Sequence, residues 1–379
     1  MGDCFIIPTY WSVPGMDTWK TFDHPVPIEE DGTLRRTLEN FAANGYQQPV
    51  VLFPAPTEPR IEQKVKQLAT GLKLNLHVFS AEDLERIKQL MRDKGFAAEF
   101  LEDVHMRSYG AIRNMGLIYA NLKGYENVIQ IDDDELIEDP EYISKATGNI
   151  GTTWQGDEVL GKTGYYVDED GKAYYDGQMS VEYKNWPKDR LFNADIKQSL
   201  EHPDPLSPTI GAVGGNMVIN RKMYHQVCYD PYSTRGEDDD YAINALAKNM
   251  KFFFDKQLWI RHLPPQRHKA FWTRSRQDII RFKYLREKIR IYGFTPQQMG
   301  VFIGHFTTDQ LEFMAVSSSI DAARHFLKQG QADESEGFLD NAVLAVELDC
   351  LELRRTAEKF LRFQESWSQT MPKIEGAWA

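Results

Sequence analysis

Strand-like and helix-like segments alternate along about the first 130 residues, and this alternation constrains the fold more than any other feature of the sequence. Short apolar runs such as "CFIIPTYW" and "PVVLFP" each precede a segment with apolar residues at helical spacing, as in "TLRRTLENFAANG" and "RIEQKVKQLATG". Ser80 comes before a third such segment, with Glu82 and Asp83 in the first turn, where the helix dipole favours acids. The pattern predicts an α/β fold with a mostly parallel sheet and helices on both faces.

The pattern changes twice in the rest of the chain. Residues 151–210 are rich in Gly, Tyr, Trp and Pro, and we expect them to form an inserted cover over the sheet. Strands return in "IGAVGGNMVINRKMY" and "MKFFFDKQLWIRH", whereas only helical patterns follow residue 275. We therefore expect an α/β domain over residues 1–275 and a helical region over residues 276–379, through which two copies could pair as a homodimer.

The charge balance and the cysteines exclude several classes of protein. Acidic residues outnumber basic ones by 56 to 44, which argues against a nucleic-acid partner. Cys4, Cys228 and Cys350 are odd in number and form no C-x-x-C pair, which argues against a disulfide framework or a structural zinc site. The sequence has no basic leader and no long apolar run, so we expect no transmembrane segment and a cytoplasmic protein.

Three consecutive aspartates follow a strand-like run in "NVIQIDDDELIEDP". Like charges about 4 Å apart repel by roughly 4 kcal/mol at an effective dielectric constant near 20, so a cation normally offsets them. Asp132 and Asp134 are one residue apart and should point to the same side, where they could bind Mg²⁺ or Mn²⁺ together with phosphate oxygens. A solvated acidic turn is the alternative; an EF-hand loop is excluded because Leu136 and Ile137 stand where it needs an acid or amide and a glycine.

A second acidic cluster, "RGEDDDY", covers residues 235–241. Acids in a first helical turn are stabilised by about 0.3–1 kcal/mol each through the helix dipole, so a purely structural role is plausible. Four acids in a row exceed what helix capping requires.

These motifs together resemble a known enzyme family. "GAIRNMGLIYANLKGYENVIQIDDDELIEDPEYI", and "GAVGGNMVINRKMY" followed by "RGEDDDYAINALAKN", look like the core of family 2 and related glycosyltransferases of the GT-A fold, including their Asp-x-Asp (DXD) motif. The resemblance covers most of residues 4–265. It implies a Rossmann-like nucleotide-diphospho-sugar transferase fold and a metal-dependent hexosyltransferase that uses a UDP- or GDP-sugar donor and a hydroxyl acceptor, such as a sugar, a glycan or a small molecule.

The resemblance also implies roles on the donor side. Asp132 would lie near the nucleotide ribose, Asp134 would hold the metal that bridges the diphosphate, and Asp133 would support the site. His262, at the end of "QLWIRH", would be a third metal ligand, although a lone histidine is more often a packed or surface residue. The other implied nucleotide-binding positions are Arg113, Pro8 and Thr9. The second strand ends in "LFPAP" without the acid that many relatives place there, which leaves the base open.

On the acceptor side, the resemblance implies that Asp238 is the general base and that Glu237 contacts the acceptor. It favours inversion at the anomeric carbon and leaves retention open. Gly214 and Gly215 permit close approach of the backbone, and the Asn216 amide could bind sugar hydroxyls. Aromatic residues in the predicted cover could pack or stack on a sugar; they are Trp154, Tyr165, Tyr166, Tyr174, Tyr175 and Trp186.

Residues 261–290 contain ten Lys or Arg and two acids, against the trend of the chain. We expect the far half of this stretch to be a solvated amphipathic helix with Ile280, Tyr284 and Ile289 facing inward. In the near half, Arg267 with its neighbours His268 and Lys269 could close over the departing nucleoside diphosphate.

Two alternatives share the predicted fold. A sugar-phosphate nucleotidyltransferase needs a Gly-rich, Arg-containing loop after the first strand, and "PTYWSVPGMDTWK" offers none. Intact Asp132, Asp134 and Asp238 argue against a non-catalytic sugar-nucleotide-binding protein but leave this alternative open.

Overall fold

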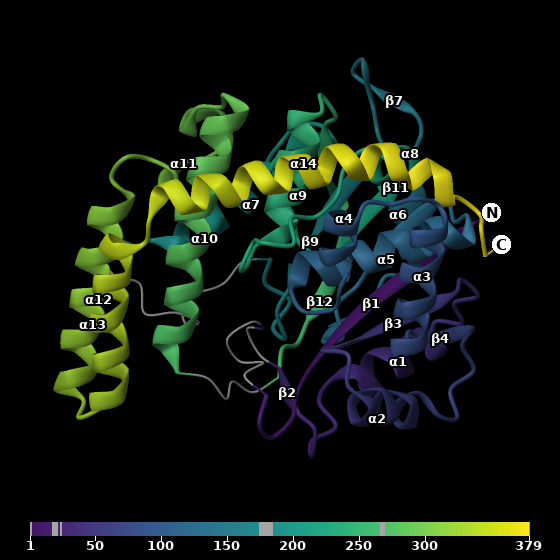
Figure 1. Ribbon diagram of the computed structural model, residues 1–379, viewed down its shortest axis with the longest axis horizontal. Coiled ribbons are helices and arrows are strands. Elements are labelled where there is room, and N and C mark those ends of the chain that lie inside the picture. The colour runs from purple at the N-terminus through teal and green to yellow at the C-terminus, as the bar shows by residue number, and fades with distance from the viewer. Residues whose placement is uncertain (1, 17–21, 23–24, 174–184, 266–269, 379) are drawn as a thin grey trace.

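The computed structural model describes residues 2–16, 22, 25–173, 185–265 and 270–378 (Figure 1). Its centre is a ten-stranded sheet in the order β10-β12-β9-β11-β5-β1-β3-β4, with β2 beside β1 and β6 beside β12. The strands are β1 (Asp3–Ser12), β2 (Val26–Pro27), β3 (Val50–Ala55), β4 (Leu76–Val78), β5 (Asn127–Gln130), β6 (Glu135–Leu136), β9 (Gly161–Val167), β10 (Leu206–Thr209), β11 (Met217–Asn220) and β12 (Phe252–His262).

Parallel pairing predominates in the first half of the chain. β1 pairs in parallel with β2, β3 and β5, and β3 with β4. One further parallel pair joins β9 to β12, from the second half. The antiparallel pairs are β11 with β5 and β9, and β12 with β6 and β10. The predicted α/β class with a mostly parallel sheet is therefore confirmed.

Helices cover both faces of this sheet. Phe5 and Ile7 of β1 share one buried cluster with α1 (Leu34–Ala43) and α2 (Pro59–Ala69). Cys4 and Ile6 point the other way, into a cluster with α3 (Ala81–Asp93), α4 (Ala98–Glu102) and α5 (Tyr109–Lys123). A Cβ added at Gly116 of α5 would lie 2.8 Å from the Ile6 side chain, so this glycine lets the helix lie close against β1.

The segment at 151–210 is only partly a cover. It follows α6 (Tyr142–Thr147) and includes the small hairpin of β7 (Thr153–Trp154) and β8 (Asp157–Glu158), and helix α7 (Lys188–Leu200). However, β9 lies between β11 and β12 in the central sheet, and β10 forms its edge. Two strands of the predicted cover therefore belong to the sheet, while Tyr174 and Tyr175 lie outside the described residues.

Beyond residue 270, every regular element in the described part of the chain is a helix, as predicted. The elements are α10 (Phe271–Tyr292), η2 (Pro296–Met299), α11 (Phe302–Phe306), α12 (Leu311–Lys328), α13 (Ala332–Glu347) and α14 (Cys350–Ile374). In Figure 1, α12 and α13 form an antiparallel hairpin at the end of the molecule away from the termini. Helix α14 runs from this hairpin along the molecule toward α5. Asn121 of α5 donates a hydrogen bond from Nδ2 to the Met371 carbonyl oxygen at 2.7 Å.

Helix α10 is buried, which corrects the prediction of a solvated far half. Its apolar residues share a core with Ile243 of α9 (Glu237–Ala247) and with Trp186. Lys288 is fully buried, with its Nζ 2.8 Å from an Asp230 carboxylate oxygen and also paired with Asp240. The helix begins at Phe271, before the predicted boundary. The buried ion pair of Lys288 with Asp240 connects it to α9.

No helix in the described part of the chain is long and apolar enough to cross a membrane. The hairpin of α12 and α13 exposes several large apolar side chains, including Phe313, Leu327, Leu339 and Val346. Pairing of two copies through the C-terminal helices stays a prediction.

Candidate active site

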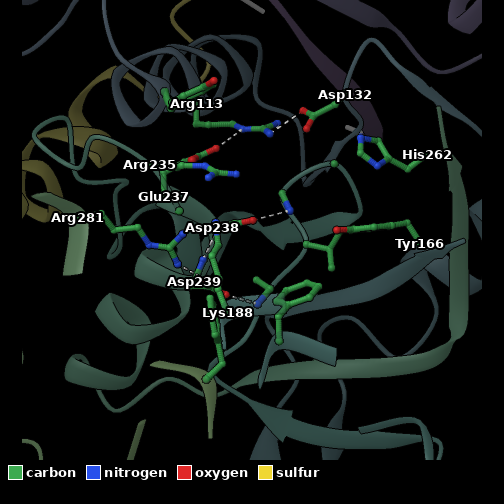
Figure 2. Close-up of a pocket in the computed structure, with 18 of the residues that line it drawn as sticks. Arg113, Asp132, Tyr166, Lys188, Arg235, Glu237, Asp238, Asp239, His262 and Arg281 are labelled. Carbon is green, nitrogen blue, oxygen red and sulfur yellow. Dashed lines mark hydrogen bonds and ion pairs between the residues drawn. The ribbon is translucent and has the colours of Figure 1, made fainter. Parts of the chain in front are cut away.

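A cavity of about 230 Å³ opens at the carboxyl end of β5 (Figure 2). Its walls come from α5, the turn after β5, the loop before β11, the end of β12 and the first turn of α9, with α7 and α10 closing one end. Ligands in open α/β sheets gather at this edge, so the cavity lies where the sequence predicted a site.

Arg113 of α5 connects the two acidic motifs across this cavity. Its side chain is 2% exposed; it donates a hydrogen bond to Asp132 at 2.6 Å, and its Nε lies 3.5 Å from a Glu237 carboxylate oxygen. Burial alone would lower the pKa of the guanidinium, but the charges of Asp132 and Glu237 outweigh it and raise that pKa. Nε and Nη1 find no hydrogen-bond partner among the described residues, so this buried cation has donors left for an anionic ligand.

The turn after β5 brings Asp134 to His262. The Asp134 side chain is 4% exposed, and its Oδ2 lies 3.3 Å from Nε2 of His262, the last residue of β12. β12 reaches this point because His262 pairs with Glu135 of β6. A carboxylate and an imidazole at this distance suit a transition metal such as Mn²⁺. Within the described ranges no three Asp, Glu, His or Cys side chains are grouped to hold a metal, so protein ligands would have to be supplemented by ligand oxygens.

Glu135 is a site residue that the sequence analysis missed. It is 2% exposed and accepts a hydrogen bond from the Asp132 N–H at 2.7 Å. A Cβ added at Gly215 would lie 2.0 Å from its Oε1, so the carboxylate lies directly against that glycine. Burial first, and then the charges of Asp132 and Asp134, raise the pKa of Glu135. Its place directly after the three aspartates was the available signal.

The four acids that open α9 have different partners. Glu237 faces Arg113; Asp239 accepts hydrogen bonds from the Ala212 N–H at 3.0 Å and from Arg281 at 2.8 Å; Asp240 pairs with Lys288. Asp238 lines the cavity, partly exposed, and among the described residues it accepts hydrogen bonds only from backbone N–H groups, those of Gly214 (3.0 Å) and Asp239 (2.9 Å).

Two of the buried acids in this cluster also have raised pKa values. Burial, followed by the charge of Asp238, raises the pKa of Glu237 to about 7 and that of Asp239 to about 7. Within the described part of the chain, Asp238 is the member of the cluster that lines the cavity without a cation paired to it.

Other predicted residues lie outside the cavity wall. Pro8 and Thr9 are buried within β1, where the Thr9 hydroxyl accepts a hydrogen bond from the Trp11 indole at 2.8 Å. Asp133 contributes its backbone oxygen to a hydrogen bond from Thr37. Arg267, His268 and Lys269 lie outside the described residues.

Asn216, predicted to bind sugar hydroxyls, is fully buried. Its Oδ1 accepts a hydrogen bond from the Tyr142 hydroxyl at 2.8 Å, and its Nδ2 donates to the carbonyl oxygens of Tyr165 (3.0 Å) and Leu258 (3.2 Å). Both ends of the amide are thus used to hold the sheet together. Gly214 and Gly215 do line the cavity, as does Tyr166, whose ring centroid is 5.0 Å from that of His262.

Four cations at one end of the cavity were not predicted as site residues. Lys188 belongs to α7, Arg235 precedes Gly236, and Arg274 and Arg281 belong to α10. In the view of Figure 2, Asp238 lies between His262 on one side and Arg281 on the other. The density of basic residues at 261–290 was a signal for two of the four.

Comparison with protein-family models finds no match, and comparison with curated proteins finds none either. Among solved structures, a mannosyltransferase from Pyrobaculum calidifontis in complex with GDP-Man and Mn²⁺ is 12% identical, with a TM-score of 0.49, over 98% of this chain and 86% of that one. Glucosyl-3-phosphoglycerate synthase from Mycobacterium tuberculosis in complex with Mg²⁺ and UDP is 12% identical, with a TM-score of 0.39, over 74% and 79% of the two chains. Mannosyl-3-phosphoglycerate synthase from Rubrobacter xylanophilus is 14% identical, with a TM-score of 0.37, over 77% and 75%. Likenesses this weak establish neither a family nor a function for this chain.

Proposed function

We propose that this protein transfers a sugar from a nucleotide diphosphate sugar to a hydroxyl acceptor, with the help of Mg²⁺ or Mn²⁺. The observation that carries the proposal is that His262, the buried Arg113 guanidinium and the Asp238 carboxylate line one cavity, with the Asp134 carboxylate behind its wall 3.3 Å from His262. A metal-binding pair, a cation for the diphosphate and a base are the three groups that such a transfer requires.

Asp134 and His262 would hold the divalent cation, which when bound would supply electrophilic assistance to the leaving diphosphate. Arg113 is fixed by Asp132 and Glu237, and two of its nitrogens, Nε and Nη1, have no hydrogen-bond partner within the described ranges. It would donate these hydrogen bonds to the diphosphate and stabilise the negative charge that develops there as the sugar leaves.

Asp238 would act as the general base. It would accept the proton of the acceptor hydroxyl while that oxygen attacks the anomeric carbon and the bond from this carbon to the diphosphate oxygen breaks. The products are the glycosylated acceptor, a nucleoside diphosphate and a protonated Asp238 that returns its proton to water. One such base opposite the leaving group corresponds to inversion. The N–H of Gly214 keeps the carboxylate in place.

A screen of thermal stability tests the donor and the metal. UDP, GDP, CDP, dTDP and their sugars are added to the wild type with Mn²⁺ or with EDTA. We expect one nucleotide to stabilise the protein only with Mn²⁺, by about 2.7 kcal/mol at about 100 times its Kd. Asp134→Asn and His262→Ala should remove this effect, whereas Glu141→Gln, which alters an exposed carboxylate, should keep it. Stabilisation that is absent in the wild type, or that persists in EDTA, would contradict the proposal.

A further inference from the structure

One buried side chain of α1 holds the backbone on both sides of Asp134. Thr37 is fully buried, and its hydroxyl donates to the carbonyl oxygens of Asp133 at 2.9 Å and of Glu135 at 3.0 Å. A threonine hydroxyl carries a single proton, so the two carbonyl oxygens share it. The chain just before Asp134 and the chain just after it are therefore tied to the same point on α1.

Asn40, one turn further along α1, extends these contacts. Its Oδ1 accepts a hydrogen bond from the Ile137 N–H at 2.9 Å, and its Nδ2 donates to the Ile137 carbonyl oxygen at 3.0 Å. The carbonyl oxygens of residues 133, 135 and 137 thus all accept hydrogen bonds from side chains of α1. The whole segment that carries Asp134 is fixed against this helix.

The same helix also holds the chain beside His262. Arg36, next to Thr37, donates from Nη2 to the Leu263 carbonyl oxygen at 2.7 Å. The Leu263 N–H in turn donates to the Asp134 carbonyl oxygen at 2.9 Å. Asp134 and His262 belong to separate segments of the chain, and α1 is hydrogen-bonded to the backbone beside both of them.

Packing alone does not explain a threonine at this position of α1. The apolar buried residues of the helix, Leu34, Leu38 and Phe41, already pack in the cluster that includes Phe5 of β1. Threonine is a weaker helix former than leucine or alanine, and inside a helix its hydroxyl often bonds a carbonyl oxygen of the preceding turn. The Thr37 hydroxyl is bonded outside its own helix instead. The residue therefore suits the turn that it bonds better than the helix that contains it.

We propose that Thr37 and Arg36 are positioning residues of the metal site, which hold Asp134 and His262 at a separation that suits a divalent cation. The inference rests on the proposed function, because it takes Asp134 and His262 as the metal ligands. Adjacent ligand atoms at about 2.1 Å from an octahedral ion lie roughly 3.0 Å apart. Oδ2 of Asp134 and Nε2 of His262 are 3.3 Å apart.

The positioning role is separate from contact with the substrate. In the described part of the chain, the side chains that line the cavity do not include Thr37 or Arg36. Both would therefore act through the two ligands. Groups that orient metal ligands commonly change metal affinity about tenfold to a hundredfold when they are replaced.

Titration with Mn²⁺ alone tests the inference without knowledge of the nucleotide, because the electron paramagnetic resonance signal of the free ion measures its unbound concentration. Thr37→Val keeps the shape of the side chain without the hydroxyl, and it should weaken Mn²⁺ binding about tenfold or more. Thr37→Ser keeps the hydroxyl and should restore binding to within about threefold of the wild type. Thr356→Val is the matched control, since Thr356 bonds the Glu352 carbonyl oxygen within α14, and it should bind Mn²⁺ as the wild type does.

A second variant decides the question if Thr37→Val does not fold, which urea unfolding in EDTA would reveal. Arg36 is exposed, so Arg36→Met should fold as the wild type does. Loss of its hydrogen bond to Leu263 should weaken Mn²⁺ binding about twofold to tenfold. Wild-type affinity in the folded Thr37→Val and Arg36→Met proteins would overturn the inference. A loss of affinity in Thr37→Ser as large as that in Thr37→Val would also overturn it.

Failure of this inference can be told apart from failure of the proposed function. Asp134→Asn should abolish Mn²⁺ binding; if it binds the ion as well as the wild type does, the proposed metal site is wrong and the positioning role is wrong with it. If Asp134→Asn loses the ion but Thr37→Val and Arg36→Met keep it, only the positioning role is refuted. If the wild type binds no free Mn²⁺, α1 holds no site ready for the ion and the inference fails, while the thermal screen still decides the proposed function.

Discussion

Replacement of Asp238 by asparagine should separate catalysis from binding and folding. Asparagine keeps an oxygen that can accept the Gly214 N–H at 3.0 Å, and the side chain is partly exposed, so we expect a stability loss of about 1 kcal/mol or less. It cannot accept a proton. Loss of a general base lowers rates by about 10²–10⁴-fold, which corresponds to about 2.7–5.4 kcal/mol of activation free energy.

The assay measures release of the nucleoside diphosphate with the donor found in the thermal screen and an acceptor that turns over with the wild type. The Kd for the nucleotide with Mn²⁺ is measured in parallel, and Glu141→Gln serves as the control. We expect kcat to fall by at least about a hundredfold while the nucleotide Kd stays within about twofold. A kcat within tenfold of the wild type would refute Asp238 as the base, and a joint loss of stability and nucleotide binding would make its role structural.

Two further predictions concern stability. Lys288→Met should destabilise the fold by about 3–5 kcal/mol at pH 8, because it leaves Asp230 and Asp240 buried without their cation. Burial raises the pKa of Asp240 to about 6 even beside Lys288, so at pH 5 Asp240 binds a proton and the loss of stability should shrink. Urea unfolding at both pH values checks this, and equal losses would contradict it. Gly215→Ala should cost about 1–3 kcal/mol, because its Cβ would lie 2.0 Å from Glu135. Gly211→Ala, in the same loop, is the control, because the added Cβ would lie no closer than 3.7 Å to any atom outside the adjoining residues, and it should change the urea midpoint of unfolding little.

The sequence was sufficient to predict the parallel half of the sheet and one side of the cavity, but it did not predict that β9 and β10 join the sheet. Alternating apolar runs identify β1, β3 and β5, and the carboxyl ends of parallel strands meet at one edge, so the aspartates after β5 had to lie there. Asp132, Asp238 and His262 come from three separate segments and do line one cavity. Their roles in binding and catalysis stay predictions.

The opposite side of the cavity could not be predicted, because periodicity shows which residues share a helix face but not how many elements surround that helix. The helix predicted to be solvated contains Lys283 and Lys288, yet α13 and α14 contact α10 and both lysines are buried. Lys188 and Asp278 are 90 residues apart, and no local pattern connects them. Asn216 illustrates the reverse error, since its amide is used up by partners that a sequence motif does not reveal.

The path of α14 has a consequence for how the protein folds during its synthesis. Asn121 and Met371 are 250 residues apart, yet they are joined by a hydrogen bond. This bond, and the one from the Trp367 indole to the Tyr224 carbonyl oxygen, hold α14 against the α/β half of the protein. A ribosome makes α5 long before it makes this covering helix, so the nascent α/β half emerges with an apolar surface open to water. We expect such an intermediate to depend on chaperones until translation reaches the last helix.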